Sequence, residues 1–183
     1  NTTKITTQNH TPKTAPATQR ASKTNPPNGT QILEDIGMMK MLPNMTVVVP
    51  ADYEQTRQAT LAIAKLHGPV YLRFGRPKVP VFIDAEAPFE LGKIQKVISG
   101  VDLTIAACGH LVWEAVQAAV ELAKDGIHAE VLNVHTIKPL DEKTLLASAQ
   151  KTGHVLVAEE HQRLGGLGSS VAQCLAANHP TTM

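Results

Sequence analysis

The stretch Thr46–Pro77, TVVVPADYEQTRQATLAIAKLHGPVYLRFGRP, contains the pattern of a strand, a helix and a second strand in direct succession. The short apolar run Val47–Val49, ended by a proline, is typical of a buried strand. Asp52 predicts a helix start, because an Asx cap followed by Gln55 at the third helical position satisfies free amide groups. Gly68 ends this helix. The order strand, helix, strand favours parallel pairing with a right-handed crossover.

The second strand places an arginine near its carboxyl end. Side chains alternate between the two faces of a strand, so Tyr71 and Arg73 share one face. Ligands of open parallel sheets bind at the carboxyl ends of the strands. A planar guanidinium there suits a phosphate or a carboxylate. The alternative for Arg73 is an ion pair with a neighbouring acid at the rim of the sheet.

A second α/β unit follows a proline-punctuated stretch without helical pattern, from Gly75 to about Glu90, which we interpret as a linker with some extended structure. The alternation of strand and helix patterns continues after it and predicts an α/β fold with a mostly parallel sheet. The predicted elements, beginning with one before the quoted stretch, are a helix over 32–42, a strand over 102–108, a helix over 112–123, a strand over 129–134, a helix from Asp141 to 149, a strand over 154–158 and a helix from 165 to about 177.

Composition narrows the class of protein. The chain has 183 residues, and its 43% hydrophobic content is enough for one or two domains with a sizeable core. No apolar run reaches the length of a membrane span and no signal-peptide pattern occurs, so we expect a cytoplasmic protein that does not bind membranes. Cys108 and Cys174 lie in separate apolar elements, which predicts buried thiols and no metal site.

Residues 1–30 differ from the rest of the chain. They are dominated by Thr, Asn, Pro and Lys, and they bury too little apolar surface to offset their ordering entropy, so we expect a disordered arm. The alternative is a functional basic arm, because the segment has four basic residues and no acid. The remainder therefore has a net charge of −3 by subtraction from +1. That balance gives no electrostatic reason to expect nucleic acid as a partner.

The glycine-rich turn EEHQRLGGLGSS, Glu159–Ser170, resembles a phosphate cradle only superficially. It lacks the lysine of a P-loop, and its glycine spacing is not the dinucleotide fingerprint. Close packing of a helix on the sheet is the better interpretation. His161 and the Glu159-Glu160 pair follow a strand end, where acid/base chemistry is conceivable, but a surface or subunit-contact role is favoured because no nucleophile or metal partner stands near them. The same holds for His110.

Four stretches in order carry a family resemblance. DIGMMKMLPNMTVVVPAD, GPVYLRFGRP, NVHTIKPLDE and VAEEHQRLGGLGSS resemble the C-terminal part of thiamine diphosphate-dependent transketolases, most closely the C-terminal subunit of split transketolases. The resemblance implies a partial pyrimidine-binding domain at 31–84, a linker at 85–90 and a truncated transketolase C-terminal domain at 91–183. It also implies that Arg73 binds the phosphate of the sugar substrate and that Arg76 supports it.

The resemblance also indicates which parts of the family pattern are missing. The family's activating glutamate and the aromatic residues that stack on the cofactor belong to the absent front half of the first domain. The diphosphate and its Mg²⁺ are held by another domain. The family motif Gly-Glu-Asp-Gly-x-Thr-His-Gln is reduced to Pro27–Gln31, in which Thr30 replaces the substrate-contacting histidine. We therefore interpret the chain as a fragment whose residues 1–30 are disordered or out of frame, and we expect it to bind negligible thiamine diphosphate alone.

The expected function is inherited from this family. The resemblance implies a part of an enzyme that transfers a two-carbon ketol unit between sugar phosphates, inactive alone and completed by an N-terminal transketolase subunit or domain in a homo-oligomer. Two relatives remain as alternatives: 1-deoxy-xylulose-5-phosphate synthase and the beta chain of 2-oxoacid dehydrogenases. A third alternative of a different class is a non-catalytic dimerisation or assembly module.

Overall fold

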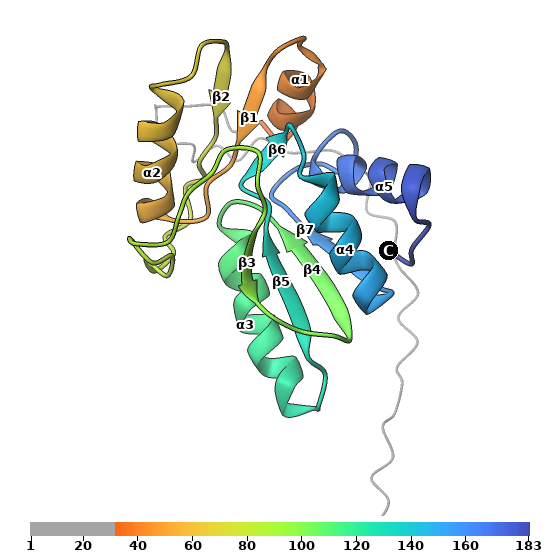
Figure 1. Cartoon of the computed structure of the whole chain (residues 1–183). Helices are drawn as coiled ribbons and strands as arrows, with labels where there is room; N and C mark the ends of the chain where they lie inside the picture. The colour runs from red at the N-terminus through yellow and green to blue at the C-terminus, as the bar shows by residue number, and fades with distance from the viewer. Residues whose placement is uncertain (1–31) are drawn as a thin grey trace, which may run out of the picture. The chain divides into compact units, whose positions relative to one another are not determined.

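The strand–helix–strand stretch folds as its pattern predicts in the computed structural model, which describes residues 32–183. β1 (Thr46–Val48) and β2 (Val70–Leu72) are parallel, and α2 (Tyr53–Ile63) connects them (Figure 1). Asp52 caps α2, and its Oδ1 accepts a hydrogen bond of 2.8 Å from the amide of Gln55. The predicted disordered arm, 1–30, lies outside the described residues.

The three-stranded sheet joins segments that are far apart in the sequence. Its strand order is β2-β1-β6, and β6 (Thr136–Lys138) runs antiparallel to β1. α1 (Asp35–Met41) precedes β1 and is shorter than the predicted helix over 32–42. The amino group of Lys138 donates hydrogen bonds to the carbonyl oxygens of Lys40 and Leu42, at 2.9 and 2.6 Å, so β6 also holds the end of α1.

The four-stranded sheet has the order β3-β5-β4-β7. β4 (Leu103–Ala107), β5 (Ala129–Asn133) and β7 (Val155–Ala158) are parallel, as predicted. β3 (Gln95–Ile98) is antiparallel to β5 and was not predicted. Both sheets are therefore mixed, and their strands are mostly parallel.

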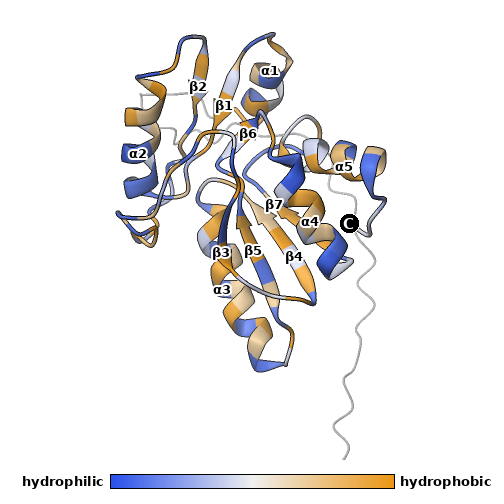
Figure 2. Ribbon diagram, viewed as in Figure 1, coloured by the Kyte–Doolittle hydropathy of each residue, from blue (hydrophilic) through white to orange (hydrophobic). Residues whose placement is uncertain are grey.

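Helices cover both faces of the four-stranded sheet. α3 (Leu111–Lys124) packs through Val112 and Ala119 on a core with Ile105 and Val131. On the other face, α4 (Glu142–Thr152) and α5 (Leu167–Asn178) pack on a core with Ala106 and Leu132. Figure 2 shows β4 in the hydrophobic colours between these helices. The successive residues of β4 and β5 thus point into opposite cores, which gives the predicted α/β/α arrangement.

Both cysteines are buried free thiols, as predicted. Burial raises the pKa of the Cys108 thiol, which therefore stays protonated at neutral pH. Within residues 32–183, no helix combines the length and apolar character that a membrane span requires.

His135 is the basis of a pH-dependent stability prediction. Its side chain lies beside Phe89, with ring centroids 4.5 Å apart, and burial lowers its pKa to about 4. The unfolded imidazole, with a pKa near 6.5, takes up its proton first, so stability is complete above pH 6.5 and falls toward pH 4. We expect urea unfolding to show a loss of about 2 kcal/mol between pH 7.5 and pH 5.0. His135→Gln should lack this loss, and an equal loss in that variant would contradict the assignment.

Candidate functional site

Arg73 lies directly after β2, at the carboxyl end of the strand. Its amide donates a 2.8 Å hydrogen bond to the carbonyl oxygen of Val48, which continues the pairing with β1. The guanidinium Nε lies 3.2 Å from Asp35 Oδ2, and NH1 lies 3.1 Å from Glu160 Oε2. The side chain is only 11% exposed. In this chain, the guanidinium therefore pairs with two acids at the rim of the sheet.

Asp35 and Tyr71 hold one side of the guanidinium. The Tyr71 hydroxyl donates a 2.8 Å hydrogen bond to Asp35 Oδ2, the same oxygen that accepts from Arg73. Burial, together with this contact to Asp35, raises the pKa of Tyr71 to about 12. The other Asp35 oxygen, Oδ1, is buried and has no hydrogen-bond partner among residues 32–183. Asp35 is thus committed to Arg73 and Tyr71, and it fixes the plane of the guanidinium.

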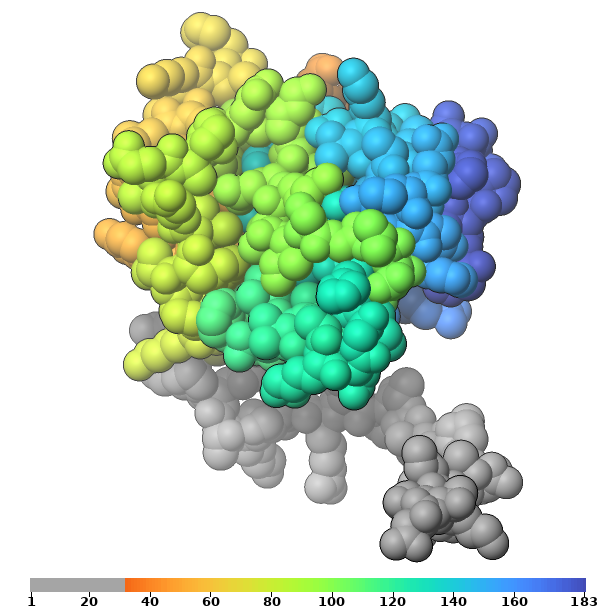
Figure 3. All heavy atoms as spheres, turned by 60° about the horizontal axis from the view of Figure 1, so that its bottom comes forward, coloured from red at the N-terminus to blue at the C-terminus, as the bar shows by residue number. Residues whose placement is uncertain are grey.

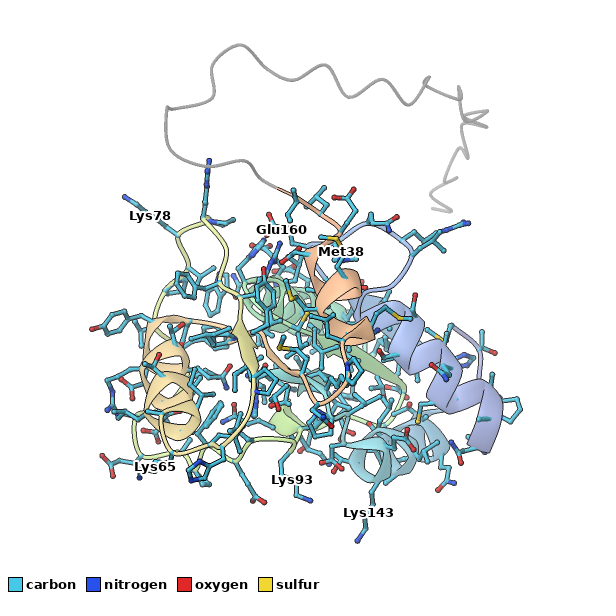
Figure 4. The ribbon with its side chains drawn as sticks, turned by 90° about the horizontal axis from the view of Figure 1, so that it is seen from above. Met38, Lys65, Lys78, Lys93, Lys143 and Glu160 are labelled. Carbon is cyan, nitrogen blue, oxygen red and sulfur yellow. The ribbon has the colours of Figure 1, made fainter. Side chains whose placement is uncertain are left out.

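Glu160 approaches the other side of Arg73 from the loop that follows β7 (Figure 4). It is 27% exposed, and its Oε2 also lies 3.9 Å from His110 Nδ1. A methyl group added at Gly75 would meet His110 Nδ1 at 3.0 Å and Glu160 Oε2 at 3.3 Å. The absence of a side chain at Gly75 therefore lets three separate segments meet around Glu160.

A hollow of about 470 Å³ opens beside His110 and Gly75. Its lining includes the exposed aromatic side chains of Tyr53 and Phe74 and the ammonium-bearing Lys78. Arg76 lies in the exposed loop that also forms this edge. The substrate-binding roles of Arg73 and Arg76 stay predictions, and the structure adds the exposed carboxylate of Glu160 as a competitor for any anion at Arg73.

The glycine-rich turn binds a carboxylate of the chain itself. Glu159 accepts hydrogen bonds from the amides of Leu167 and Gly168, at 2.6 and 2.8 Å, at the start of α5. Negative charge is favourable at a helix N-terminus, and here Glu159 supplies it. A phosphate would therefore have to displace Glu159 from α5. The expected role of the glycines in close packing fits this contact.

Gly166 gives a direct test of that contact. A methyl group built at Gly166 would lie 2.2 Å from Glu159 Oε2, closer than real methyl carbons approach an oxygen. We expect Gly166→Ala to expel the carboxylate and to lower the free energy of unfolding by about 1–2 kcal/mol, the usual cost of a lost helix cap. Gly168→Ala is the matched control, because its nearest contact would be an ordinary 3.5 Å. Equal thermal stability of the two variants would contradict the cap.

His161 has a structural environment. Its Nε2 accepts a 3.2 Å hydrogen bond from the amide of Gly37, and its Nδ1 lies 2.7 Å from the carbonyl oxygen of Gln162. The carbonyl requires a proton on Nδ1, so the network assigns the neutral tautomer with both nitrogens in use. His161 therefore ties the loop after β7 to α1.

Sequence reasoning missed the groups that surround Arg73. Asp35 precedes Arg73 by 38 residues, and Glu160 follows it by 87, so no local spacing links the three. Only the apposition of α1, β2 and the loop after β7 brings them together. Among the described residues, no group of three His, Cys, Asp or Glu side chains could hold a metal ion.

The two parts of the chain match two consecutive domains of one enzyme family. Residues 29–81 match the transketolase pyrimidine binding domain, and residues 92–182 match the transketolase C-terminal domain. This chain belongs to the transketolase family. It corresponds to the C-terminal part of a transketolase, and the family relation implies thiamine diphosphate in the complete enzyme.

Relatives named as parts of two-chain enzymes indicate the branch of the family. The chain is 49% identical over 152 residues to the 6-deoxy-6-sulfo-D-fructose transketolase subunit SqwH of a Clostridium species, a match that covers 82% of this chain and 47% of that protein. It is 40% identical over 147 residues to the second of the two chains named for the apulose-4-phosphate transketolase of Phocaeicola vulgatus, covering 80% of this chain and 47% of that protein.

A solved structure supports the same relation. A split-gene transketolase, described as an inactive β4 tetramer, superposes with a TM-score of 0.81 at 43% identity, over 83% of this chain and 51% of that chain. This transketolase chain thus spans about half the length of these relatives.

Proposed function

We propose that this chain is part of the C-terminal chain of a split transketolase and supplies the arginine that holds the terminal anion of the sugar substrate. The reaction is the transfer of a two-carbon ketol unit between sugar phosphates. The proposal assigns 31–84 to the pyrimidine-binding domain, 85–90 to the linker and 91–183 to the C-terminal domain.

The observation that carries the proposal is the place and fixation of Arg73. It lies at the carboxyl end of a parallel strand pair, where ligands of such sheets bind. Asp35 and Tyr71 hold it from the protein side, while Glu160, 27% exposed, holds it from the solvent side. A phosphate that displaced Glu160 would meet a guanidinium that is already oriented, which lowers the entropy lost on binding.

The named substrates of the relatives are consistent with an anion at this position. One relative is named for a sulfonated ketose and another for a phosphorylated one. Both substrates end in a tetrahedral group with negatively charged oxygens, the shape that a planar guanidinium binds through paired hydrogen bonds. The proposal therefore requires a terminal oxyanion and leaves the carbon skeleton to other parts of the enzyme.

The described residues do not form a site for thiamine diphosphate. Residues 32–183 contain no cluster of metal ligands that could hold the Mg²⁺ of the diphosphate. The carboxylates nearest Arg73 are already engaged: Glu159 caps α5, and Asp35 and Glu160 pair with Arg73. We therefore assign the cofactor to a partner chain and to the front half of the pyrimidine-binding domain, and derive no step of the reaction through it.

A comparison of the chain with a full-length protein that contains it tests the proposal. The front half is to be identified by reading the encoding DNA upstream of Gln31 in all three frames, and the product assayed with an N-terminal transketolase chain. We expect ketol transfer from phosphorylated donors in the complete enzyme. For the chain alone, we expect no turnover and no thiamine diphosphate binding by calorimetry. Turnover that requires pyruvate decarboxylation or a lipoyl-bearing partner would replace the proposal with one of the alternatives.

A further inference from the structure

Four lysines line one hollow of about 470 Å³ between β3 and α4. They are Lys93, Lys96, Lys143 and Lys151. Residues 32–183 contain nine lysines and have a net charge of −3, so nearly half of their ammonium groups gather at this one place. Figure 3 shows the green surface of the β3 region next to the blue surface of α4 on this face. We call this feature the lysine hollow.

A single buried carboxylate binds two of these lysines. Glu130 is completely buried, and its Oε2 contacts the amino groups of Lys96, at 3.0 Å, and of Lys151. Its Oε1 accepts a hydrogen bond from Ser148. Burial alone would raise the pKa of Glu130, but the hydrogen bonds from Lys151, Ser148 and Lys96 outweigh burial and hold that pKa below its usual value. The carboxylate is therefore ionised and saturated, and the three charges sum to +1.

The other two lysines add charge without an acid of their own. Within residues 32–183, neither Lys93 nor Lys143 forms an ion pair. Asp141 also lines the hollow, but its oxygens accept hydrogen bonds from the amides of Thr144 and Ile94, at 3.2 and 3.1 Å, and from the Thr144 hydroxyl at 2.7 Å. Both acids are thus occupied by internal donors, and the positive charge of the hollow remains in excess.

We propose that the lysine hollow binds a small molecule that carries a phosphate group and at least two negative charges. The volume is within the usual range for small-ligand sites. Long lysine side chains can close around an anion as point charges without a fixed geometry. An anion there neutralises the excess charge that Glu130 leaves.

The lysine hollow is separate from Arg73. Figure 4 shows Lys93 and Lys143 on one edge of the molecule and Glu160, the partner of Arg73, on the opposite edge. The site does not depend on the proposed ketol transfer, and its loss would leave the Arg73 pairing intact.

The test is a titration of the isolated chain with pyrophosphate in EDTA, followed by the backbone amide signals in NMR at constant ionic strength. We expect saturable shifts at residues 93–96 and 141–151. The double variant Lys93→Gln with Lys143→Gln should weaken binding by about tenfold, because two of the four ammonium groups are gone, and it should fold normally because neither lysine is in an ion pair. Raising the NaCl concentration should weaken binding of the wild type more than that of the variant.

The matched control removes the same charge elsewhere. Lys65→Gln with Lys124→Gln also subtracts two ammonium groups, on helix α2's C-terminal side and on α3, far from the hollow in sequence. This control should bind pyrophosphate as tightly as the wild type. An equal loss in both double variants, shifts confined to residues 73–76 and 160, or no saturation would each overturn the proposal and leave an adventitious ion only.

Discussion

Arg73→Ala in a complete enzyme is expected to raise the KM for phosphorylated sugars tenfold or more. A charge-assisted hydrogen bond to a phosphate contributes about 1.5–3 kcal/mol, and 1.4 kcal/mol is a factor of ten in affinity. Arg73→Lys should recover only part of the loss, because an ammonium group keeps the charge but loses the planar fork. Steady-state kinetics with a phosphorylated donor give the measurement.

The pairing of Arg73 with two acids changes how this experiment has to be interpreted. Asp35 is 3% exposed, and removal of Arg73 leaves its carboxylate buried without a cation. An uncompensated buried charge costs about 3 kcal/mol or more, so Arg73→Ala should also lower the melting temperature. Melting alone therefore does not separate binding of a phosphate from support of the fold.

The separating measurement is the comparison of two donors. An unphosphorylated two-carbon donor has no anion to place at Arg73, so its kcat/KM should change little in the part of the enzyme that remains folded. Tyr71→Phe is the structural control, because it removes the hydrogen bond to Asp35 but leaves the guanidinium in place. It should affect both donors alike and weakly. If Arg73→Ala reduces activity equally with both donors, Arg73 belongs to the fold and the phosphate role is wrong.

Glu160 gives the same hypothesis an opposite sign. Its carboxylate occupies the solvent side of Arg73, so it competes with an incoming anion. Glu160→Gln should therefore lower the KM for phosphorylated donors, whereas a purely structural ion pair would predict damage. This reversal follows from the structure alone, since nothing local in the sequence places Glu160 beside Arg73.

Local patterns predicted the parts of the fold that depend on local physics. The run Val47–Val49, the caps at Asp52 and Asp141, and the stripe along 112–123 each reflect a requirement that neighbouring residues satisfy by themselves. β3 and β6 were missed because they are short antiparallel additions whose side chains show no strict alternation. β6 pairs with β1, 88 residues away, and no local spacing predicts such a partner.

The candidate site was predictable only in part for the same reason. The strand-end rule placed Arg73, since alternation and the carboxyl-end position depend on the strand itself. Its two acids come from α1 and from the loop after β7, and only the assembled fold brings them within hydrogen-bonding distance. The lysine hollow likewise combines residues from β3, β5 and α4 around a glutamate that has the pattern of an ordinary strand residue in the sequence.

Asp52→Ala is expected to cause the largest loss of stability, about 3–5 kcal/mol. Asp52 is 5% exposed, and its Oδ1 caps α2 through the amide of Gln55. Its Oδ2 accepts two more hydrogen bonds of 2.8 Å, from the amides of Phe82 and Ile83. A lost cap costs about 1 kcal/mol, and each buried amide left without a partner costs about 1–3 kcal/mol. Urea unfolding monitored by circular dichroism measures the change.

Asp84→Ala is the matched control for this prediction. Asp84 is exposed and accepts a single local hydrogen bond of 3.0 Å from the amide of Glu86, so its removal should cost less than about 1 kcal/mol. Asp52→Asn should be intermediate, because its amide keeps one acceptor oxygen and turns an NH₂ group toward a donor. Since Asp52 fastens the segment 82–83 to α2, amide exchange should accelerate at both places in Asp52→Ala. Loss confined to the first turn of α2 would show that Asp52 is only a helix cap and does not join the two parts of the chain.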